Sequence, residues 1–159
     1  MTSPTPIRPP IRDAIKAATI DAMKARDSAR LGALRLIGAA LKNKDIELRT
    51  GSAPADDNVL VADVLMKMAK QRRESIEMYD KGGRAELADA ERAELAVIEG
   101  FLPAQMTEAQ ADAAIRVLVA EIGATSVKDM GRVMAAMKER YAGQMDMSKA
   151  NALVKAALS

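Results

Sequence analysis

The chain has 159 residues, no Cys and no His, and a formal net charge of +2 from 24 basic and 22 acidic residues. These absences exclude thiol nucleophiles, disulfides, Cys/His zinc sites and an imidazole base. Apolar residues make up 49% of the chain, but aromatic residues only 2%. Because the rest is dominated by good helix formers such as Ala, Leu, Met, Glu, Lys and Arg, the composition predicts an all-α fold.

The first ten residues contain four prolines and no apolar signal region. Residues 1–10 are therefore predicted to form a disordered arm and not a targeting peptide. Every apolar run is much shorter than the roughly 20 residues that a membrane helix needs. We accordingly expect a cytoplasmic protein without membrane contact, and we expect no metal or cofactor.

The charges are unevenly distributed along the chain. Residues 1–49 hold ten basic and five acidic residues, residues 50–103 hold seven and eleven, and residues 104–159 hold seven and six. A chain of this kind can meet nucleic acid with one face, but it lacks the strong basic bias of a dedicated binder.

Apolar residues at helical spacing predict a four-helix domain over residues 11–102, with helices at about 11–26, 29–49, 58–81 and 84–102. Asp27-Ser28 is expected to cap the second helix and Asp57 the third. Gly82-Gly83 is expected to end the third helix.

One face of the second helix carries Leu34, Leu41 and Leu48 at seven-residue spacing. Gly38 lies on the same face, which predicts close approach of a neighbouring helix. If this leucine face is exposed in the monomer, it favours a dimer or a partner helix.

The sequence Phe101-Leu102-Pro103 predicts a break, followed by a three-helix tail domain over residues 103–159. Thr107 and Gln110 form a predicted capping box. A second tail helix is expected at about 127–142, capped by Ser126-x-x-Asp129, and a third is expected to be capped by Asp146 or Ser148 and to run through Leu158.

Three charged residues lie on otherwise apolar stripes of the third and fourth helices. Arg72 shares a face with the apolar residues of the third helix, and Glu91 and Glu94 share one with those of the fourth. We expect the three to meet as an interhelical ion cluster that fixes the register of the two helices. A pair of carboxylates for acid–base chemistry or Mg²⁺ binding is the less favoured alternative.

The second tail helix contains the most motif-like segment of the chain. Its predicted inward stripe consists of Val127, Met130, Met134, Met137 and Tyr141. Its outer side presents Lys128, Gly131, Arg132 and Arg140. A glycine inside a helix costs about 1 kcal/mol relative to alanine, so Gly131 requires a reason. Spacing alone favours close helix packing, and the alternative is close approach of a phosphate backbone beside Lys128 and Arg132.

Five signals in order resemble the YqeY family: Lys70-Gln71-Arg72-x-Glu74-Ser75-Ile76, Gly83-Arg84-x-x-Leu87, Glu91-x-x-Glu94, Phe101-Leu102-Pro103 and Asp129-Met-Gly131-Arg132-Val-Met134. Members of this family are similar to the C-terminal region of the B subunit of the tRNA-dependent amidotransferase, whose helical tail is understood to contact tRNA. The resemblance covers nearly the whole chain from Ile11 and implies RNA contact at Lys128, Gly131 and Arg132. Arg140, on the same outer side of the helix, is assigned to the RNA-binding residues as well.

Three functions are therefore compared. The first is a helical accessory module that binds tRNA or another RNA in translation. The second, implied only by family association, is carbon–nitrogen ligase activity with glutamine as amide donor; without Cys, His or a Gly-rich phosphate loop, we assign no catalytic residue to it. The third is a protein-interaction module that docks a partner in translation through the methionine-rich tail or the leucine face. The sequence favours the first.

Overall fold

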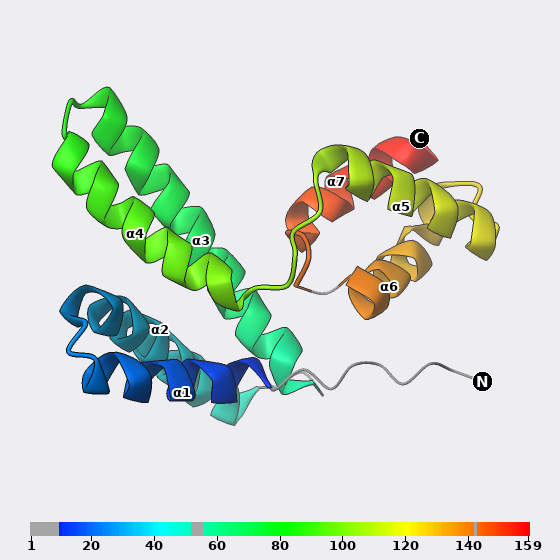
Figure 1. Cartoon of the computed structure of the whole chain (residues 1–159). Coiled ribbons are helices and arrows are strands. Elements are labelled where there is room, and N and C mark those ends of the chain that lie inside the picture. Colours follow the sequence, from blue (N-terminus) through cyan, green and yellow to red (C-terminus); the bar gives the residue numbers. More distant parts are fainter. Residues whose placement is uncertain (1–9, 52–55, 142) are drawn as a thin grey trace. The chain divides into compact units, whose positions relative to one another are not determined.

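The computed structural model describes residues 10–51, 56–141 and 143–159, and over these residues the protein is all-α, as predicted. Figure 1 shows the helices in order: α1 (Ile11–Lys24), α2 (Ser28–Glu47), the short η1 (Leu48–Thr50), α3 (Asp57–Lys81), α4 (Ala85–Phe101), α5 (Glu108–Ile122), the short η2 (Val127–Asp129), α6 (Met130–Tyr141) and α7 (Met147–Leu158). Apart from Pro10, the predicted arm lies outside the described residues.

The chain divides into two compact units, residues 1–102 (unit 1) and residues 103–159 (unit 2). Each unit has its own hydrophobic core. In unit 1, α1 and α2 form one helical hairpin and α3 and α4 form a longer one (Figure 1). In unit 2, α5, α6 and α7 pack against one another in all three pairings.

The leucine face of α2 is covered within the chain itself. Leu34 is 1% exposed, Leu41 is 4% exposed, and Leu48 packs against the same core. This face therefore gives no support to a partner helix or a dimer. The expectation for Gly38 is wrong: the residue is exposed, and a Cβ placed on it would meet no atom within 4 Å.

The half of the α3–α4 hairpin next to the connecting turn, residues 70–94, is held differently from the rest of unit 1; we call it the distal hairpin. Every buried residue of α3 lies between Leu60 and Ala69, and in the described part of residues 70–94 only Ala88 is buried. Leu87 of α4 is 39% exposed. Ion pairs instead connect the two helices here, including Arg92 with Asp80.

Most helix ends follow the local signals in the sequence. Asp27 caps α2 by accepting a hydrogen bond from the backbone N–H of Arg30, and Asp146 caps α7 in the same way through Ser148. Thr107 and Gln110 form both hydrogen bonds of the predicted capping box. The N-cap of α3 is Asp56 and not Asp57, which leaves the Asp57 carboxylate free for a long-range contact.

Candidate nucleic-acid interface

The predicted RNA-binding residues lie on η2 and α6 of unit 2. Lys128, Gly131, Arg132 and Arg140 are all exposed. The side chain of Lys128 forms no ion pair with any described residue, whereas both arginines are paired with carboxylates of their own unit. Arg132 Nη2 lies 2.7 Å from Asp129 Oδ1, and Arg140 Nη1 lies 2.8 Å from Glu121 Oε2 of α5. The tail surface is thus less positive than the sequence pattern suggests.

Asp129 serves a different purpose from the one predicted. Ser126 makes no side-chain cap, and Asp129 Oδ2 instead accepts a hydrogen bond from the backbone N–H of Thr125 at 3.0 Å. This bond, followed by the contact with Arg132, lowers the pKa of the Asp129 carboxyl below its usual value. Asp129 therefore stays charged at neutral pH and ties the start of α6 to the preceding loop.

The inward stripe of α6 agrees with the predicted one except at its start: Met137 is buried, and Met130, Met134 and Tyr141 pack against the core of unit 2. Val127 is 46% exposed, whereas Val133, which was not expected inside, is fully buried beside Met137. Val127 is displaced because residues 127–129 form a 3₁₀ turn, and regular α-helix begins only at Met130. Val133 lies three residues after Met130 and four before Met137, so it belongs to the same side of α6.

Close packing does not explain Gly131. The residue is exposed, and a Cβ placed on it would meet no atom within 4 Å in the described structure. The space above it is open, between the exposed side chains of Lys128 and Arg132. No described neighbour within unit 2 therefore requires a glycine at this position.

The structure brings Arg72, Glu91 and Glu94 together across α3 and α4. Arg72 Nε lies 3.3 Å from Glu91 Oε2 and 2.8 Å from Glu94 Oε2, and the three side chains are 20–32% exposed. The N–H is poorly aimed, because neither Arg72 Nε nor Glu91 Oε2 makes a hydrogen bond with a described residue. A cation held between the two carboxylates offers no free acid–base pair, so the arrangement is best understood as structural.

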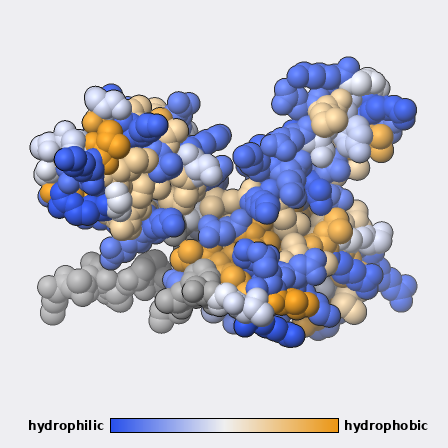
Figure 2. Space-filling view, turned by 180° about the vertical axis from the view of Figure 1, so that it is seen from behind, coloured by the Kyte–Doolittle hydropathy of each residue, from blue (hydrophilic) through white to orange (hydrophobic). Residues whose placement is uncertain are grey.

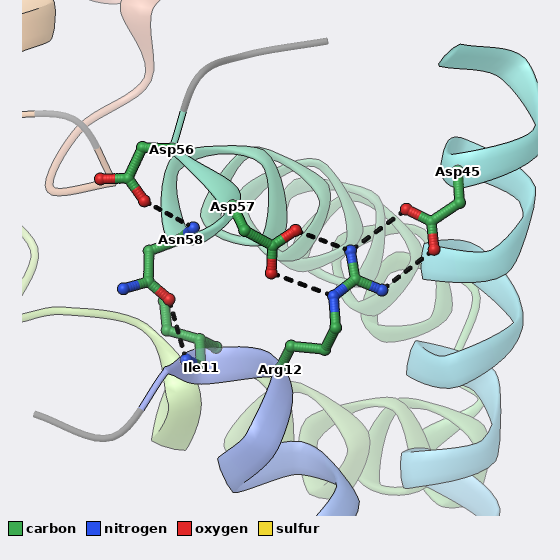
Figure 3. A network of polar contacts seen from close by, with 6 residues as sticks. All are labelled: Ile11, Arg12, Asp45, Asp56, Asp57 and Asn58. Atoms are coloured by element: carbon green, nitrogen blue, oxygen red, sulfur yellow. Dashed lines mark hydrogen bonds and ion pairs between the residues drawn. The ribbon is translucent and has the colours of Figure 1, made fainter. Parts of the chain in front are cut away.

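A second polar network in unit 1 was not expected from the sequence (Figure 3). The Arg12 guanidinium of α1 donates two hydrogen bonds of 3.0 and 3.1 Å to Asp45 of α2 and two of 3.0 Å to Asp57 of α3. Arg12 lowers the pKa of Asp57, chiefly through its hydrogen bonds, and the two carboxylates raise the pKa of Arg12.

Beside this network the backbone N–H of Ile11 donates a hydrogen bond of 2.9 Å to Asn58 Oδ1. The two contacts together fix the start of α1 to the first turn of α3. Periodicity could not reveal this, because Arg12 lies off the apolar stripe; the only local signal is the pair of adjacent carboxylates at residues 56 and 57, of which one is enough for a cap.

The profile of the family described as Yqey-like protein matches residues 12–158 of the chain. The chain belongs to the YqeY family. Among YqeY relatives, it is 34% identical over 83 residues to "Altered inheritance of mitochondria protein 41, mitochondrial" of Eremothecium gossypii, covering 52% of this chain and 44% of the relative. The same-named protein of Lachancea thermotolerans is 31% identical over 104 residues, covering 64% of this chain and 54% of the relative.

The matches thus span about half the length of these curated relatives. Their names place those proteins in mitochondria and state no molecular activity. No helix in the described parts of this chain is long and apolar enough to cross a membrane. Family membership confirms the resemblance seen in the sequence, and RNA binding is a separate proposal.

Proposed function

We propose that this YqeY protein is an accessory module in translation that binds the phosphate backbone of tRNA through the outer face of its tail. The observation that carries the proposal is Gly131. This helical glycine is exposed, has open space above it and is flanked by exposed Lys128 and Arg132. A glycine with no packing neighbour at this point lets a phosphate come close to the helix backbone, with two cations beside it.

The ion pairs of the tail do not prevent this contact. The side chains of Arg132 and Arg140 are 61% and 49% exposed, and pairs of this kind contribute only about 0–1 kcal/mol. A phosphate offers an arginine the same bidentate geometry as a carboxylate. Arg132 can therefore exchange Asp129 for a phosphate at small cost, while Lys128 has no pair to break.

The resemblance to the amidotransferase tail supports tRNA as the RNA. The glutamine-dependent ligase alternative gains nothing from the residues that the structure describes. We expect the protein to act in the cytoplasm; cell fractionation tests this, and recovery with mitochondria, as the names of the relatives say of those proteins, would refute it.

The test is binding of purified protein to bulk tRNA at low and high salt. Lys128→Glu/Arg132→Glu is expected to abolish binding, and wild-type binding is expected to weaken with salt because phosphate contacts release counterions. The matched control is Lys149→Glu/Lys155→Glu, which makes the same charge change at two exposed lysines of α7. If wild type does not bind tRNA at low salt, the proposal is wrong.

A second pair of variants isolates Arg132. Asp129→Asn removes its carboxylate partner but keeps an oxygen that accepts from the Thr125 N–H. It is expected to tighten tRNA binding more than Asp112→Asn, which releases Arg116 of α5 with the same charge change. Equal effects of the two substitutions would mean that only net charge matters.

A further inference from the structure

A row of exposed basic side chains runs along α2 of unit 1, outside the tail motif. Arg35, Lys42 and Arg49 recur every seven residues; we call them the basic row. Arg35 and Lys42 share one side of α2, because residues seven apart in an α-helix drift by only about 20°. All three are exposed, and none forms an ion pair with a described residue. Arg49 follows directly in η1.

Neither carboxylate of α2 forms an ion pair with the basic row. Asp45 is paired with Arg12 at 3.0 Å and Glu47 with Lys44 at 3.5 Å. Part of the excess positive charge of residues 1–49 therefore lies in a row of cations that have no ion-pair partner among the described residues. Such a row attracts polyanions over a distance of about 10 Å at 0.1 M salt.

On the side of α2 that carries the basic row, no large side chain stands between Arg35 and Lys42. Gly38 lies between Arg35 and Lys42 on the same side of α2, with no atom within 4 Å of a Cβ placed on it. Consecutive cations of the row are separated by about 10 Å along the helix axis, from seven residues at about 1.5 Å each. A charged chain lying along α2 therefore meets cations at its contact points and no bulky side chain between the first two.

The kind of polyanion follows from what the surface lacks. Residues 11–47 contain no aromatic side chain, so bases have nothing to stack on, and recognition must rest on phosphates. On the face of unit 1 seen in Figure 2, hydrophobic residues are interspersed with hydrophilic ones. A membrane-bound helix instead needs a continuous apolar side.

We propose that the basic row of α2 is a second RNA-contacting surface that binds the phosphate backbone of duplex RNA. The inference rests on the proposed function, since it takes RNA as the partner, but it assigns a surface outside the tail motif. The two surfaces differ in chemistry: the tail must exchange carboxylates for phosphates at Arg132 and Arg140, whereas the cations of the basic row have no carboxylate partner among the described residues.

The test compares salt dependence across variants, using labelled bulk tRNA and an RNA duplex of similar length as probes. Arg35→Glu/Lys42→Glu is expected to reduce the slope of log affinity against log salt by about 2, one for each lost phosphate contact. The matched control, Lys67→Glu/Lys70→Glu, changes the same charge at two exposed lysines of α3 and is expected to keep the wild-type slope. Circular dichroism checks the fold, and Arg35→Gln/Lys42→Gln replaces the first variant if it unfolds.

Each outcome separates the two proposals. If the basic-row variant behaves like its α3 control while Lys128→Glu/Arg132→Glu loses binding, the inference is overturned and the tail proposal stands. If the wild type binds neither RNA at low salt, both are overturned. Binding to anionic phosphatidylserine vesicles through the basic row, without RNA binding through it, also overturns the inference. A slope reduced by about 2 in the basic-row variant, with the wild-type slope kept in its α3 control, supports it.

Discussion

Arg72 allows a quantitative test of what holds the distal hairpin together. Arg72→Ala leaves Glu91 and Glu94, one turn apart and 20% and 32% exposed, without their shared cation. Breaking a fully buried pair costs about 3–5 kcal/mol, and a surface pair is worth about 0–1 kcal/mol. Because the cluster is partly exposed and its N–H is poorly aimed, we expect a loss of about 1–3 kcal/mol.

The chain provides a convenient assay for this loss. It has no Trp and two tyrosines, Tyr79 in α3 and Tyr141 in α6. In a Tyr141→Phe background, tyrosine fluorescence therefore reports on unit 1 alone during urea unfolding, which avoids treating two units as a single transition. With a slope of about 2 kcal/mol per M urea, the unfolding midpoint should fall by about 0.5–1.5 M.

Two companion variants make the test decisive. Arg73→Ala removes the neighbouring pair with Glu99, whose side chains are 54% and 45% exposed, and is expected to cost less than about 1 kcal/mol. Arg72→Met/Glu91→Gln/Glu94→Gln removes the repulsion together with the cation and should recover most of the loss. The reasoning is refuted if Arg72→Ala costs no more than Arg73→Ala, or if the triple variant is as unstable as the single one.

Three further predictions follow from the structure. Because Arg12 lowers the pKa of Asp57, this pair stabilises unit 1 at pH values above the unfolded-state pKa of about 4, and the stabilisation is lost as pH falls through the folded-state pKa. The stability of unit 1 should therefore fall less steeply with decreasing pH in Arg12→Met. An unchanged pH dependence would contradict the assignment. Gly131→Ala should stabilise unit 2 by about 0.5–1 kcal/mol in thermal unfolding, since nothing obstructs the added methyl group, while weakening tRNA binding. Gly38→Ala is its control in unit 1, with a similar gain in stability, and a loss of stability in either variant would show that the open space is filled. Thr107→Ala removes one bond of the capping box and should destabilise unit 2 by about 1 kcal/mol, with Glu108→Ala as a control of smaller effect.

The features that the sequence predicted best are helix caps, which depend only on residues close together in the chain. The caps at Asp27, Thr107 and Asp146 need only residues within one turn. The all-α fold follows from composition and helical periodicity in the same way. These features are local, so a single sequence contains the information for them.

What sequence could not provide depends on other elements or on a change of helix type. Asp57 was assigned to a cap because no nearby residue indicates its contact with Arg12, which lies 45 residues away. Val127 lies outside the core because residues 127–129 form a 3₁₀ turn before α6 begins. The positive face of the tail was overestimated because a helical wheel shows which way Arg140 points but not that Glu121 of another helix meets it.

The distal hairpin also implies that α3, although a single continuous helix, consists of two segments that open independently. Residues 60–69 are anchored in the apolar core, while residues 70–81 depend on α4 and on ion pairs. Opening of the second segment exposes little apolar surface, so its amides should exchange with solvent deuterium well before those of the first, and faster still as salt screens the pairs. A ligand that binds this end of the hairpin would slow the exchange in proportion to its occupancy. The amide exchange rate of residues 70–81 therefore measures binding.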